Sequence, residues 1–398
     1  MWFRAPLELG VTKINEQKRN SPVFIPTLLV TGIGGPTPRA IVRSLKQHGR
    51  FGPYRVIGVD CNPFALGLYE SAFIDKAYLV PHAKEASYWK EIERIVRAEN
   101  ITVAVIQPDI EVASWSERIE QEKAPCLAFL PPYELVKVLL NKWEITRALH
   151  ETGLAPHTVR VDLTDSESEV VIDSLGLPFW VRGVAGSSGL GALKIENRDD
   201  LKCWIRIQPQ IRQFIASEYL PGRNFGCVCI FWKGELLRAA CLERVQYLMS
   251  RVAPSGITGN ASFGRLVNSP ELVALASQAV GHVCRKTVTK PHGVLTVDFK
   301  EDAGGVPKVT EINVRHVATT SALAAGGANL AEDTVQLALG HLERVPRDGS
   351  FVFKEGLVFL RDVDGAPIVM SEENLLKSKP YWPGLISGLS IKSRLENG

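Results

Sequence analysis

Three side chains with oxygen donors in the last third of the chain form the most informative pattern of the sequence. Asp298 lies in one strand-like run, Glu311 and Asn313 lie in a second, and a glycine-bearing turn separates the runs. This pattern predicts a β-hairpin. Because residues two apart share one face of a strand, Glu311 and Asn313 point the same way, and the hairpin can bring Asp298 beside them. Such a set is typical of a site for Mg²⁺, which usually also binds substrate phosphates.

A solvated hairpin with ordinary surface charges fits these residues equally well, because short motifs often match by chance. Arg315 continues the face of Glu311 and Asn313 and adds a fixed positive charge. The choice between the two interpretations therefore depends on what the rest of the chain can bring to the hairpin.

A glycine loop in the middle of the chain is a second pattern. Residues 183 to 191 read GVAGSSGLG and connect two strand-like runs. Glycine allows positive φ angles, so the backbone N–H groups of such a loop can approach an anion, and Ser187 and Ser188 could add donors. The loop lacks the Gly-Lys-Ser/Thr ending of a Walker motif, and taken alone it fits a hairpin loop without a ligand slightly better.

The surroundings of the glycine loop alter that balance. Arg182 ends the strand before the loop, and Lys142 lies on the helix that leads into this region. Each could be a lone surface cation. Together with the acidic hairpin they could form a cradle for a triphosphate, with cations and amides on one side and Mg²⁺ on the other.

The order of these parts resembles the ATP-grasp superfamily, in its carbamoyl-phosphate-synthetase-like, carboxylate–amine ligase branch. The resemblance covers roughly residues 28 to 345. It rests on five motifs in the family's order: Lys142 on the entering helix, Arg182 at a strand end, the glycine loop, Glu-Tyr-Leu-Pro-Gly at 218–222, and Asp298 with the strand TEINVR. Each motif is weak alone, but five in order at compatible spacing are strong.

The resemblance implies that ATP is a substrate and that its phosphates meet the middle of the chain. Lys142 and Arg182 would hold the α- and β-phosphates. The glycine loop would close over the γ-phosphate, with the contacts coming from Gly186, Ser187, Ser188 and Gly189. Arg182 stands where a lysine is commoner, although arginine occurs in the carbamoyl-phosphate-synthetase branch.

The resemblance also implies where the nucleoside binds. Main-chain groups near Glu218, Tyr219 and Leu220 would contact the adenine edge. Asn224 stands where a ribose-binding glutamate is usual, so the ribose contact transfers least securely. An asparagine can still hydrogen-bond a hydroxyl, but without the help of a charge.

At the hairpin, the resemblance assigns Mg²⁺ (or Mn²⁺) to Asp298, Glu311 and Asn313. Arg315 would contact the transferred phosphoryl group or the acceptor carboxylate, as a catalytic residue. Arg244 is a second catalytic candidate, and an exposed arginine is an equally good interpretation of it. Val314 replaces the family's proline, which should matter little because it lies on the opposite strand face.

Near the N-terminus, TGIGGP followed by Asp60 resembles a dinucleotide-binding fingerprint. Gly32 and Gly34 fit, but Thr37 stands where the third glycine should be, and Pro36 makes the loop rigid. A dinucleotide-dependent oxidoreductase is therefore an alternative that Thr37 argues against.

In the ATP-grasp family this first domain usually lends loops to the acceptor site instead. Residues 32 to 37, Asp109 and Glu111 are then candidate acceptor-side groups, although the two acids also fit ordinary carboxylates at a strand end.

Alternating strand and helix patterns from Thr27 onward predict βαβ units and a parallel sheet. The expected fold class is α/β and α+β: an ATP-grasp fold with an N-terminal Rossmann-like parallel-sheet domain. We expect the following divisions: an extension over 1–27, the Rossmann-like domain over 28–134, the ATP-grasp domain over 135–345 with a lid subdomain at about 157–217, and a C-terminal segment over 346–398.

Three local features of the ATP-grasp region carry further predictions. Leu135 to Thr152 is expected to form one helix. Residues 242 to 268 lack a clear period and are expected to form a long active-site lid, in which Arg251 is an exposed arginine. His316 should face away from the site and be structural, by strand alternation.

Composition places the chain among ordinary globular proteins of two or three domains. The chain has 398 residues, 45% hydrophobic and 22% charged, and its net charge of +3 does not suggest a nucleic-acid binder. No apolar run approaches the ~20 residues that span a bilayer, and no signal-peptide core is present. The seven cysteines contain no Cys-x-x-Cys pair, so we expect free thiols and a reducing cytoplasm.

The leading hypothesis is an ATP- and Mg²⁺-dependent ligase that converts a carboxylate to an acyl phosphate and couples it to an amine. Expected partners are small-molecule carboxylate and amine substrates, with neither nucleic acid nor membrane, and a homodimer is an open alternative. The hypothesis also leaves two functions open: a carbamoyl-phosphate-type kinase on a small carboxylate such as bicarbonate, and a non-catalytic ATP-binding regulator.

Overall fold

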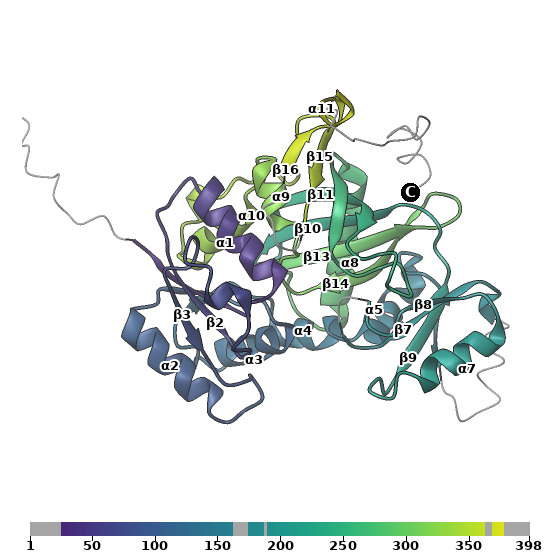
Figure 1. Cartoon of the computed structure of the whole chain (residues 1–398), viewed down its shortest axis with the longest axis horizontal. Coiled ribbons are helices and arrows are strands. Elements are labelled where there is room, and N and C mark those ends of the chain that lie inside the picture. The colour runs from purple at the N-terminus through teal and green to yellow at the C-terminus, as the bar shows by residue number, and fades with distance from the viewer. Residues whose placement is uncertain (1–24, 162–173, 187–188, 363–367, 378–398) are drawn as a thin grey trace, which may run out of the picture.

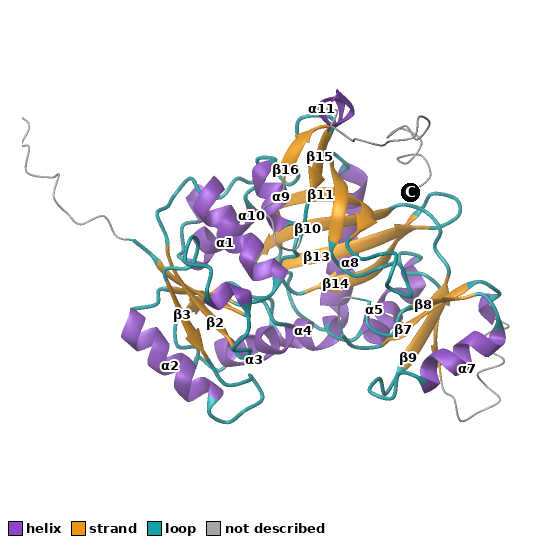
Figure 2. Cartoon of the chain, in the orientation of Figure 1, coloured by secondary structure: helices purple, strands orange, loops and turns teal. Residues whose placement is uncertain are grey.

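A computed structural model of the chain describes residues 25–161, 174–186, 189–362 and 368–377. Three sheets make up this part of the chain: a five-stranded sheet, a four-stranded sheet and a seven-stranded sheet. Figures 1 and 2 show the five-stranded sheet at one end, the four-stranded sheet at the other and the largest sheet between them. The predicted fold class, mixed α/β with an N-terminal parallel sheet, is confirmed.

The N-terminal sheet is parallel throughout and has the order β3-β2-β1-β4-β5. Its strands are β1 (Thr27–Thr31), β2 (Arg55–Asp60), β3 (Lys76–Leu79), β4 (Val103–Val105) and β5 (Leu127–Ala128). Its helices are α1 (Pro36–His48), α2 (Tyr88–Glu99) and α3 (Asp109–Glu120). The strand β1 is buried along its whole length, which explains its unbroken apolar sequence.

In the glycine-containing turn between β1 and α1, a backbone N–H group is already hydrogen-bonded within the protein. The backbone N–H of Gly34 donates a hydrogen bond to Asp60 Oδ2 at 2.8 Å. Pro36 and Pro38, in the first turn of α1, have no N–H to offer. The loop therefore has few free donors for a dinucleotide pyrophosphate.

The four-stranded sheet is antiparallel, with the order β6-β9-β7-β8. Its strands are β6 (Thr158–Val161), β7 (Phe179–Gly183), β8 (Leu193–Ile195) and β9 (Phe214–Glu218). The helix α7 (Arg198–Arg206) lies between β8 and β9 in the chain. The glycine loop connects β7 and β8, as the sequence predicts. The strands of this sheet span nearly the same residues, 158 to 218, as the predicted lid subdomain.

The central sheet is antiparallel and has the order β14-β13-β10-β11-β12-β15-β16. Its strands are β10 (Asn224–Trp232), β11 (Glu235–Tyr247), β12 (Ala261–Val267), β13 (Gly293–Glu301), β14 (Pro307–Asn313), β15 (Leu357–Leu360) and β16 (Ile368–Ser371). The helices that accompany it are α8 (Pro270–Lys286), α9 (Thr320–Ala325) and α10 (Leu330–Ala338), with the short α11 (Glu372–Lys377) at its end. Because β15 pairs with β12, part of the predicted C-terminal segment extends this sheet.

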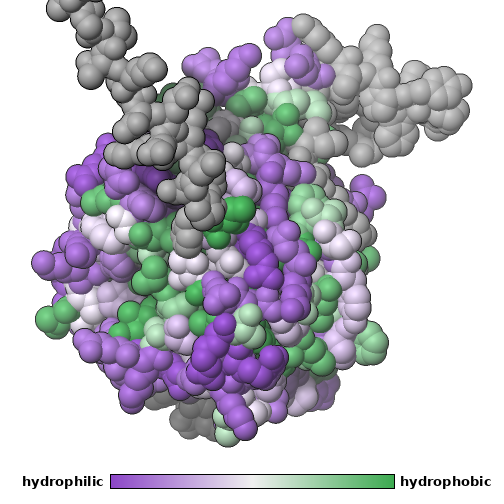
Figure 3. Space-filling view, turned by 90° about the vertical axis from the view of Figure 1, so that its left-hand side faces the viewer, coloured by the Kyte–Doolittle hydropathy of each residue, from purple (hydrophilic) through white to green (hydrophobic). Residues whose placement is uncertain are grey.

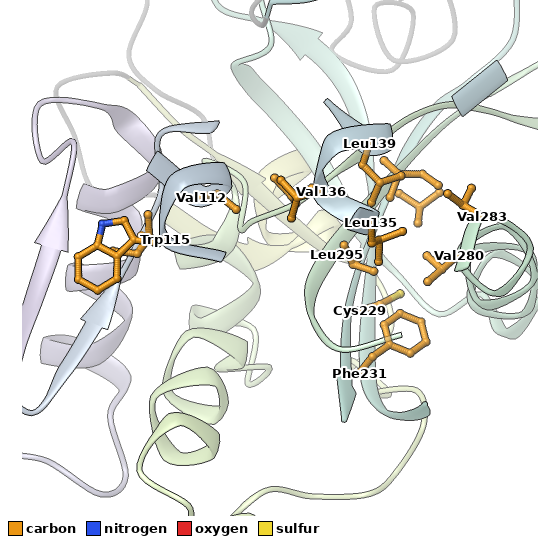
Figure 4. Close-up of a cluster of buried hydrophobic side chains, with 14 of the residues drawn as sticks. Val112, Trp115, Leu135, Val136, Leu139, Cys229, Phe231, Val280, Val283 and Leu295 are labelled. Atoms are coloured by element: carbon orange, nitrogen blue, oxygen red, sulfur yellow. The ribbon is translucent and has the colours of Figure 1, made fainter. Parts of the chain in front are cut away.

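One hydrophobic core joins the first domain to the central sheet. It runs from Trp115 of α3 through the helix of Leu135 to one face of β10 and β13, where α8 covers the sheet. Figure 4 shows Val280 of α8 and Leu295 of β13 among the side chains of this cluster. The shared core fixes the first domain against the strands that carry the candidate site.

The helix predicted from Leu135 to Thr152 is wrong as one element. The structure has α4 (Tyr133–Leu139), α5 (Lys142–Leu149) and a short 3-10 turn (His150–Thr152). Asn141 interrupts the helix because its side chain accepts hydrogen bonds from the N–H groups of Trp143 and Glu144, as an N-cap does. The break makes Lys142 the first residue of α5.

The long lid predicted over 242 to 268 is also wrong in extent. The strand β11 continues to Tyr247 and β12 begins at Ala261, so only residues 248–260 connect them. Register shifts near Arg244 and Gln246 disturb the alternation of β11, which explains the missing period in the sequence. Arg244 therefore lies in β11 and not in a loop. Arg251 lies in the 248–260 connection and is exposed, as the sequence predicts.

The surface and the helices carry two further observations. Figure 3 views the molecule from the side of the parallel sheet, and hydrophobic and hydrophilic residues are interspersed on the coloured part of that face. Within the described ranges, no helix is both long enough and apolar enough to cross a membrane.

Candidate functional site

A pocket of about 340 Å³ lies between the four-stranded sheet and the central sheet, beside the N-terminus of α1. Its walls come from β7 and the glycine loop, from β9 and the residues after it, from the β13–β14 hairpin, and from the N-terminus of α1. Nearly all the candidate residues named from the sequence line it. Those in the described part of the chain are Lys142, Arg182, Gly186, Gly189, Glu218, Tyr219, Leu220, Asn224, Arg244, Asp298, Glu311, Asn313 and Arg315.

The predicted hairpin is confirmed and brings its polar residues together. Asp298 of β13 lies directly opposite Glu311 of β14, next to a register shift between Asp298 and Phe299. The amide of Asn313 donates from Nδ2 to Asp298 Oδ2 at 3.1 Å. This bond leaves the amide oxygen of Asn313 as the atom that can face a cation.

Basic groups from distant parts of the chain meet these acids. Lys142 Nζ lies 3.0 Å from Glu311 Oε1 and donates to the carbonyl of Gly186 at 2.5 Å. Arg244 Nη2 lies 2.6 Å from Asp298 Oδ1. Each predicted metal-binding carboxylate is therefore paired with a cation in the structure.

Arg182 differs from the other cations in having little protein to bind. Its Nη2 donates to the carbonyl of Thr310 at 2.8 Å, and its buried Nε has no hydrogen-bond partner among the described atoms. Burial lowers the pKa of Arg182, although the charges of Glu311 and Asp298 oppose this effect. A half-buried guanidinium that lines the pocket and has no acidic hydrogen-bond partner among the described residues fits a site that is completed by an anion.

The two acids of the hairpin experience different surroundings. Burial raises the pKa of Asp298, and the Arg244 charge opposes part of that rise. Burial acts the same way on Glu311, but the charges of Lys142 and Arg182 outweigh it, so the pKa of Glu311 is lowered. Glu311 is therefore firmly ionised at neutral pH.

Arg244 is held in place by the central sheet. Its Nη1 donates to Asn224 Oδ1 and to the carbonyl of Phe225, both at 3.0 Å. Gly226 on β10 makes room for it, because a Cβ there would lie 2.7 Å from Arg244 Nη2. The alternative interpretation of Arg244 as an exposed arginine is wrong, since its side chain is 8% exposed.

The end of β9 and the residues after it line the pocket and are held by contacts with other parts of the protein. Glu218 Oε1 accepts a hydrogen bond from the N–H of His157 at 3.0 Å. Lys300 Nζ donates to the carbonyl of Gly222 at 2.8 Å, which fixes the bend that follows. Lys194 lies over the ring of Tyr219, 4.9 Å from its centre.

The glycine loop has the backbone that the sequence predicts. Gly186, Gly189 and Gly191 have φ angles of 106°, 74° and 68°, which side-chain-bearing residues rarely adopt. Gly189 also touches the 248–260 connection, because a Cβ on it would lie 2.4 Å from the carbonyl oxygen of Ile257. Ser187 and Ser188 lie outside the described residues, so their predicted contacts stay predictions.

The structure places some of the candidate acceptor-side residues at the pocket and others away from it. Pro36 and Thr37 line the pocket, and Asp109 Oδ1 accepts from Arg315 Nε at 2.7 Å. Glu111 instead faces the first domain, where Tyr88 donates to it at 2.9 Å. Both acids lie in the first turn of α3, so their interpretation as strand-end carboxylates is wrong.

His316 is structural, as predicted. It is 1% exposed, and burial lowers its pKa to about 3. Its Nε2 lies 3.0 Å from Thr334 Oγ1 of α10. The imidazole is uncharged at neutral pH and links the segment after β14 to α10.

Sequence reasoning missed several pocket residues, because nothing in their type or spacing marks them. They include Trp180, Tyr247, Asn260, Lys300, Val317, Ala318 and Thr319. Tyr247, whose pKa burial raises to about 12, lies at the end of the part of β11 that was expected to be a loop.

The residues present fit a divalent cation held together with phosphates. Within the described ranges, no group of three or more His, Cys, Asp or Glu side chains is placed to hold a metal by itself. Mg²⁺, however, is typically bound by one or two carboxylates plus substrate phosphates and water. The described lining has five basic and three acidic side chains, a net charge that would match a triphosphate of about four negative charges with one divalent cation.

No family model matches the sequence. The formate-dependent phosphoribosylglycinamide formyltransferase of Methanocaldococcus jannaschii is 27% identical over 152 residues, which is 37% of this chain and 37% of that protein. The chain thus matches little more than a third of this curated relative's length.

Solved structures match much more of the chain. The N5-carboxyaminoimidazole synthetase of Staphylococcus aureus in complex with ADP has a TM-score of 0.64 and 16% identity, over 84% of this chain and 82% of that one. The biotin carboxylase domain of Hydrogenobacter thermophilus 2-oxoglutarate carboxylase, in complex with MgADP, ADP and bicarbonate, has a TM-score of 0.62 and 14% identity, over 84% and 74%. The chain has the ATP-grasp fold.

Proposed function

We propose that this protein is an ATP- and Mg²⁺-dependent ligase, which activates a carboxylate as an acyl phosphate and couples it to an amine, with release of ADP and phosphate. The observation that carries the proposal is the convergence of Lys142, Arg182 and the acidic hairpin in one pocket. The hairpin lies more than a hundred residues from either cation along the chain. The solved structures with this fold include complexes of ADP and MgADP, which supports the assignment of the same ligands here.

The nucleotide would occupy the part of the pocket between β9 and the hairpin. Arg182 and Lys142, which both line the pocket, would bind phosphates. The main chain near Glu218 and Leu220 would bind the adenine edge, because the Glu218 side chain is occupied by His157. Asn224 would contact the ribose while its Oδ1 accepts from Arg244.

A magnesium ion held by Asp298, Glu311 and Asn313 would neutralise charge on the phosphates. In the structure, Lys142 and Arg244 pair with the same two carboxylates. Nucleotide binding would therefore let these cations turn from the acids to the phosphates. The exchange keeps each buried charge paired in both states.

Phosphoryl transfer demands positioning and charge neutralisation more than covalent chemistry from the protein. A carboxylate oxygen of the substrate attacks the γ-phosphorus, the bond to the bridging oxygen breaks, and ADP leaves. The amine nitrogen then attacks the acyl carbon, loses its proton to solvent, and displaces phosphate. Arg315, oriented by Asp109, would hold the carboxylate at the phosphoryl end of the pocket.

The acyl phosphate must be kept from water during this sequence. The glycine loop and the 248–260 connection already touch at Gly189 and Ile257. Together they would cover the pocket once the nucleotide is bound.

The proposal is tested by an ADP-release screen on the purified protein. The panel contains formate, bicarbonate, other short carboxylates, amino acids and dipeptides, each with and without a set of amines, and products are identified by mass spectrometry. We expect ADP release that requires a carboxylate and a coupled product that requires an amine. Full turnover without any amine would support the carbamoyl-phosphate-type kinase, and tight ATP binding without ADP release would support the non-catalytic regulator.

A further inference from the structure

The glycine loop ends where the four-stranded sheet opens. The pairing of β7 with β8 stops at Val181 and Leu193, whereas the other edge of β7 stays paired with β9 as far as Gly183. The backbone of Gly191 and Ala192, which lie just before β8, is therefore not part of the strand ladder. A contact other than strand pairing has to fix this end of the loop.

A side chain from outside the loop makes that contact. Trp204 lies on α7, and its indole Nε1–H donates a hydrogen bond to the carbonyl oxygen of Gly191 at 2.9 Å. The ring of Trp204 is partly buried against the hydrophobic core between α7 and the four-stranded sheet, which includes Phe179 and Leu201. The indole therefore ties the end of the glycine loop to a packed core.

Gly191 is held closely enough to transmit this contact to its neighbours. Its φ angle is 68°, and a Cβ on it would lie 2.3 Å from Ile211 Cδ1. The N–H of Ala192 donates to the carbonyl of Gly189 at 3.0 Å, which closes a turn within the loop. Fixing Gly191 therefore also fixes the direction of the residues just before it.

These residues form one wall of the pocket. The described loop residues that line it are Gly186, Gly189, Leu190 and Ala192. The start of the loop is held by Lys142, whose Nζ donates to the carbonyl of Gly186. Because Lys142 would turn to the phosphates when the nucleotide binds, the contact from Trp204 is the one of these two that can persist in the bound state.

We propose that Trp204 is a positioning residue of the nucleotide site, whose indole N–H holds the end of the glycine loop so that the loop backbone meets the γ-phosphate of ATP. The inference rests on the proposed ligase function for the identity of the nucleotide. Trp204 acts through Gly191 and is not among the residues that line the pocket. Because ADP has no γ-phosphate, loss of the indole N–H should weaken the binding of ATP and leave that of ADP unchanged.

The main test removes the N–H and keeps the ring. The amino acid 3-benzothienylalanine, incorporated in place of Trp204 alone, has sulfur where the indole has its N–H and nearly the same shape; Trp204→Phe is the natural counterpart. Titration calorimetry in Mg²⁺ compares ADP with an unhydrolysable ATP analogue. One hydrogen bond changes an equilibrium constant by roughly two-fold to ten-fold. In both variants we expect the Kd of the analogue to rise about five-fold and that of ADP to change by less than about two-fold.

The matched control is Ile205→Val on the same helix. Ile205 is buried in the core that Trp204 packs against, so this change loosens that core and leaves the indole N–H in place. Its affinities for the two nucleotides should keep their wild-type ratio. The proposal is overturned if Ile205→Val changes the ratio as much as Trp204→Phe does, or if the ratio is unchanged in both variants at position 204.

Exchange of the indole proton with water gives a readout that needs no nucleotide. The NMR signal of this proton is assigned by its absence in Trp204→Phe. We expect it to exchange at least about ten-fold more slowly than the indole proton of free tryptophan. Exchange as fast as in free tryptophan would show that the bond to Gly191 is not formed in solution and would overturn the proposal.

The two levels of the account fail separately in this design. Wild-type protein that binds neither nucleotide would contradict the proposed ligase and the role of Trp204 with it. Wild-type protein that binds both, with an unchanged ratio in the variants of Trp204, would contradict the positioning role alone. A changed ratio without ADP release from any carboxylate in the turnover screen would sustain the positioning role and contradict the ligase.

Discussion

Replacing Glu311 by glutamine is the most informative perturbation of the candidate site. The change keeps the shape of the side chain and removes one negative charge from the hairpin. In the structure that charge lies 3.0 Å from Lys142 Nζ, with the two side chains 27% and 11% exposed. Glutamine therefore releases Lys142 from an ion pair and takes an anionic oxygen from the proposed magnesium site.

The expected magnitudes follow from this geometry. Two unit charges 3.0 Å apart attract by about 5 kcal/mol at an effective dielectric constant of about 20, but lost hydration of both groups offsets much of this. We expect the unliganded variant to lose about 2 kcal/mol of folding free energy, between the values for exposed and fully buried pairs. Without metal, nucleotide affinity should stay equal or rise by up to about five-fold, since a repulsive charge is gone.

Titration calorimetry with an unhydrolysable ATP analogue measures the effect, in EDTA and in Mg²⁺. For the wild type we expect Mg²⁺ to strengthen binding by at least about ten-fold, or about 1.4 kcal/mol. For Glu311→Gln this gain should fall below about two-fold, with ADP release down by several orders of magnitude.

The control is Glu218→Gln, the same substitution in the same pocket. Glu218 accepts a hydrogen bond from the backbone of His157 and lies outside the acidic hairpin, so its variant should keep the full effect of Mg²⁺. The reasoning is refuted if Glu311→Gln keeps the magnesium dependence of binding, or if both glutamine variants lose it equally.

Three further substitutions test separate parts of the account. Asp298→Asn should abolish ADP release, because it removes a carboxylate from the hairpin and leaves Arg244 without its ionic partner. The variant should stay folded. A turnover assay measures the first expectation and circular dichroism the second. Glu111→Gln should raise the melting temperature at pH 8 but not at pH 4. Burial raises the pKa of Glu111 from 4.5 to about 7, so the wild type loses up to about 3 kcal/mol as pH rises through that window and glutamine mimics the protonated form. Asn141→Ala should cost about 1 kcal/mol of folding free energy by removing the N-cap of α5, and should weaken nucleotide binding through Lys142, as denaturant unfolding and calorimetry would show.

Each of these has an outcome that contradicts it. Near-normal ADP release from both Asp298→Asn and Glu311→Gln would defeat the metal assignment. Equal stabilisation of Glu111→Gln at pH 4 and pH 8 would mean that Glu111 does not titrate near neutrality in the folded protein. Unchanged nucleotide affinity in Asn141→Ala would show that the helix break does not position Lys142.

The sequence predicts the site best where one strand alternates. Two residues of separation place Glu311 and Asn313 on one face whatever lies around them, and the turn before β14 fixes Asp298 opposite. The motif order then assigns Lys142 and Arg182 to the same pocket. This part of the site depends on local geometry, which a sequence encodes directly.

Two other features depend on hydrogen bonds and strand pairing that override the apolar periodicity of the sequence. Asn141 sits within an apolar period that continues past it, and only its hydrogen bonds to the next turn decide that the helix restarts there. Register shifts near Arg244 break the alternation of β11 and hide a strand within an apparent loop. The sequence pattern therefore predicts the helix break and the strand β11 incorrectly, although Lys142 and Arg244 of the site lie in them.

Pairings across domains lie further beyond sequence reasoning. Arg315 and Asp109 are 206 residues apart and meet because the shared core sets α3 against the central sheet. Such residues become visible only when every buried polar group is followed to its partner.

The central claim is that the acidic hairpin and the basic groups from the middle of the chain clamp one nucleotide through a divalent ion. A crystal structure with Mn²⁺ and an unhydrolysable ATP analogue tests it most directly, because the anomalous signal of manganese locates the ion. The account predicts one peak about 2.1 Å from oxygens of Asp298, Glu311 and Asn313, bridging to phosphates that contact Lys142 and Arg182. A nucleotide bound elsewhere, with these oxygens turned away from it, would contradict the claim.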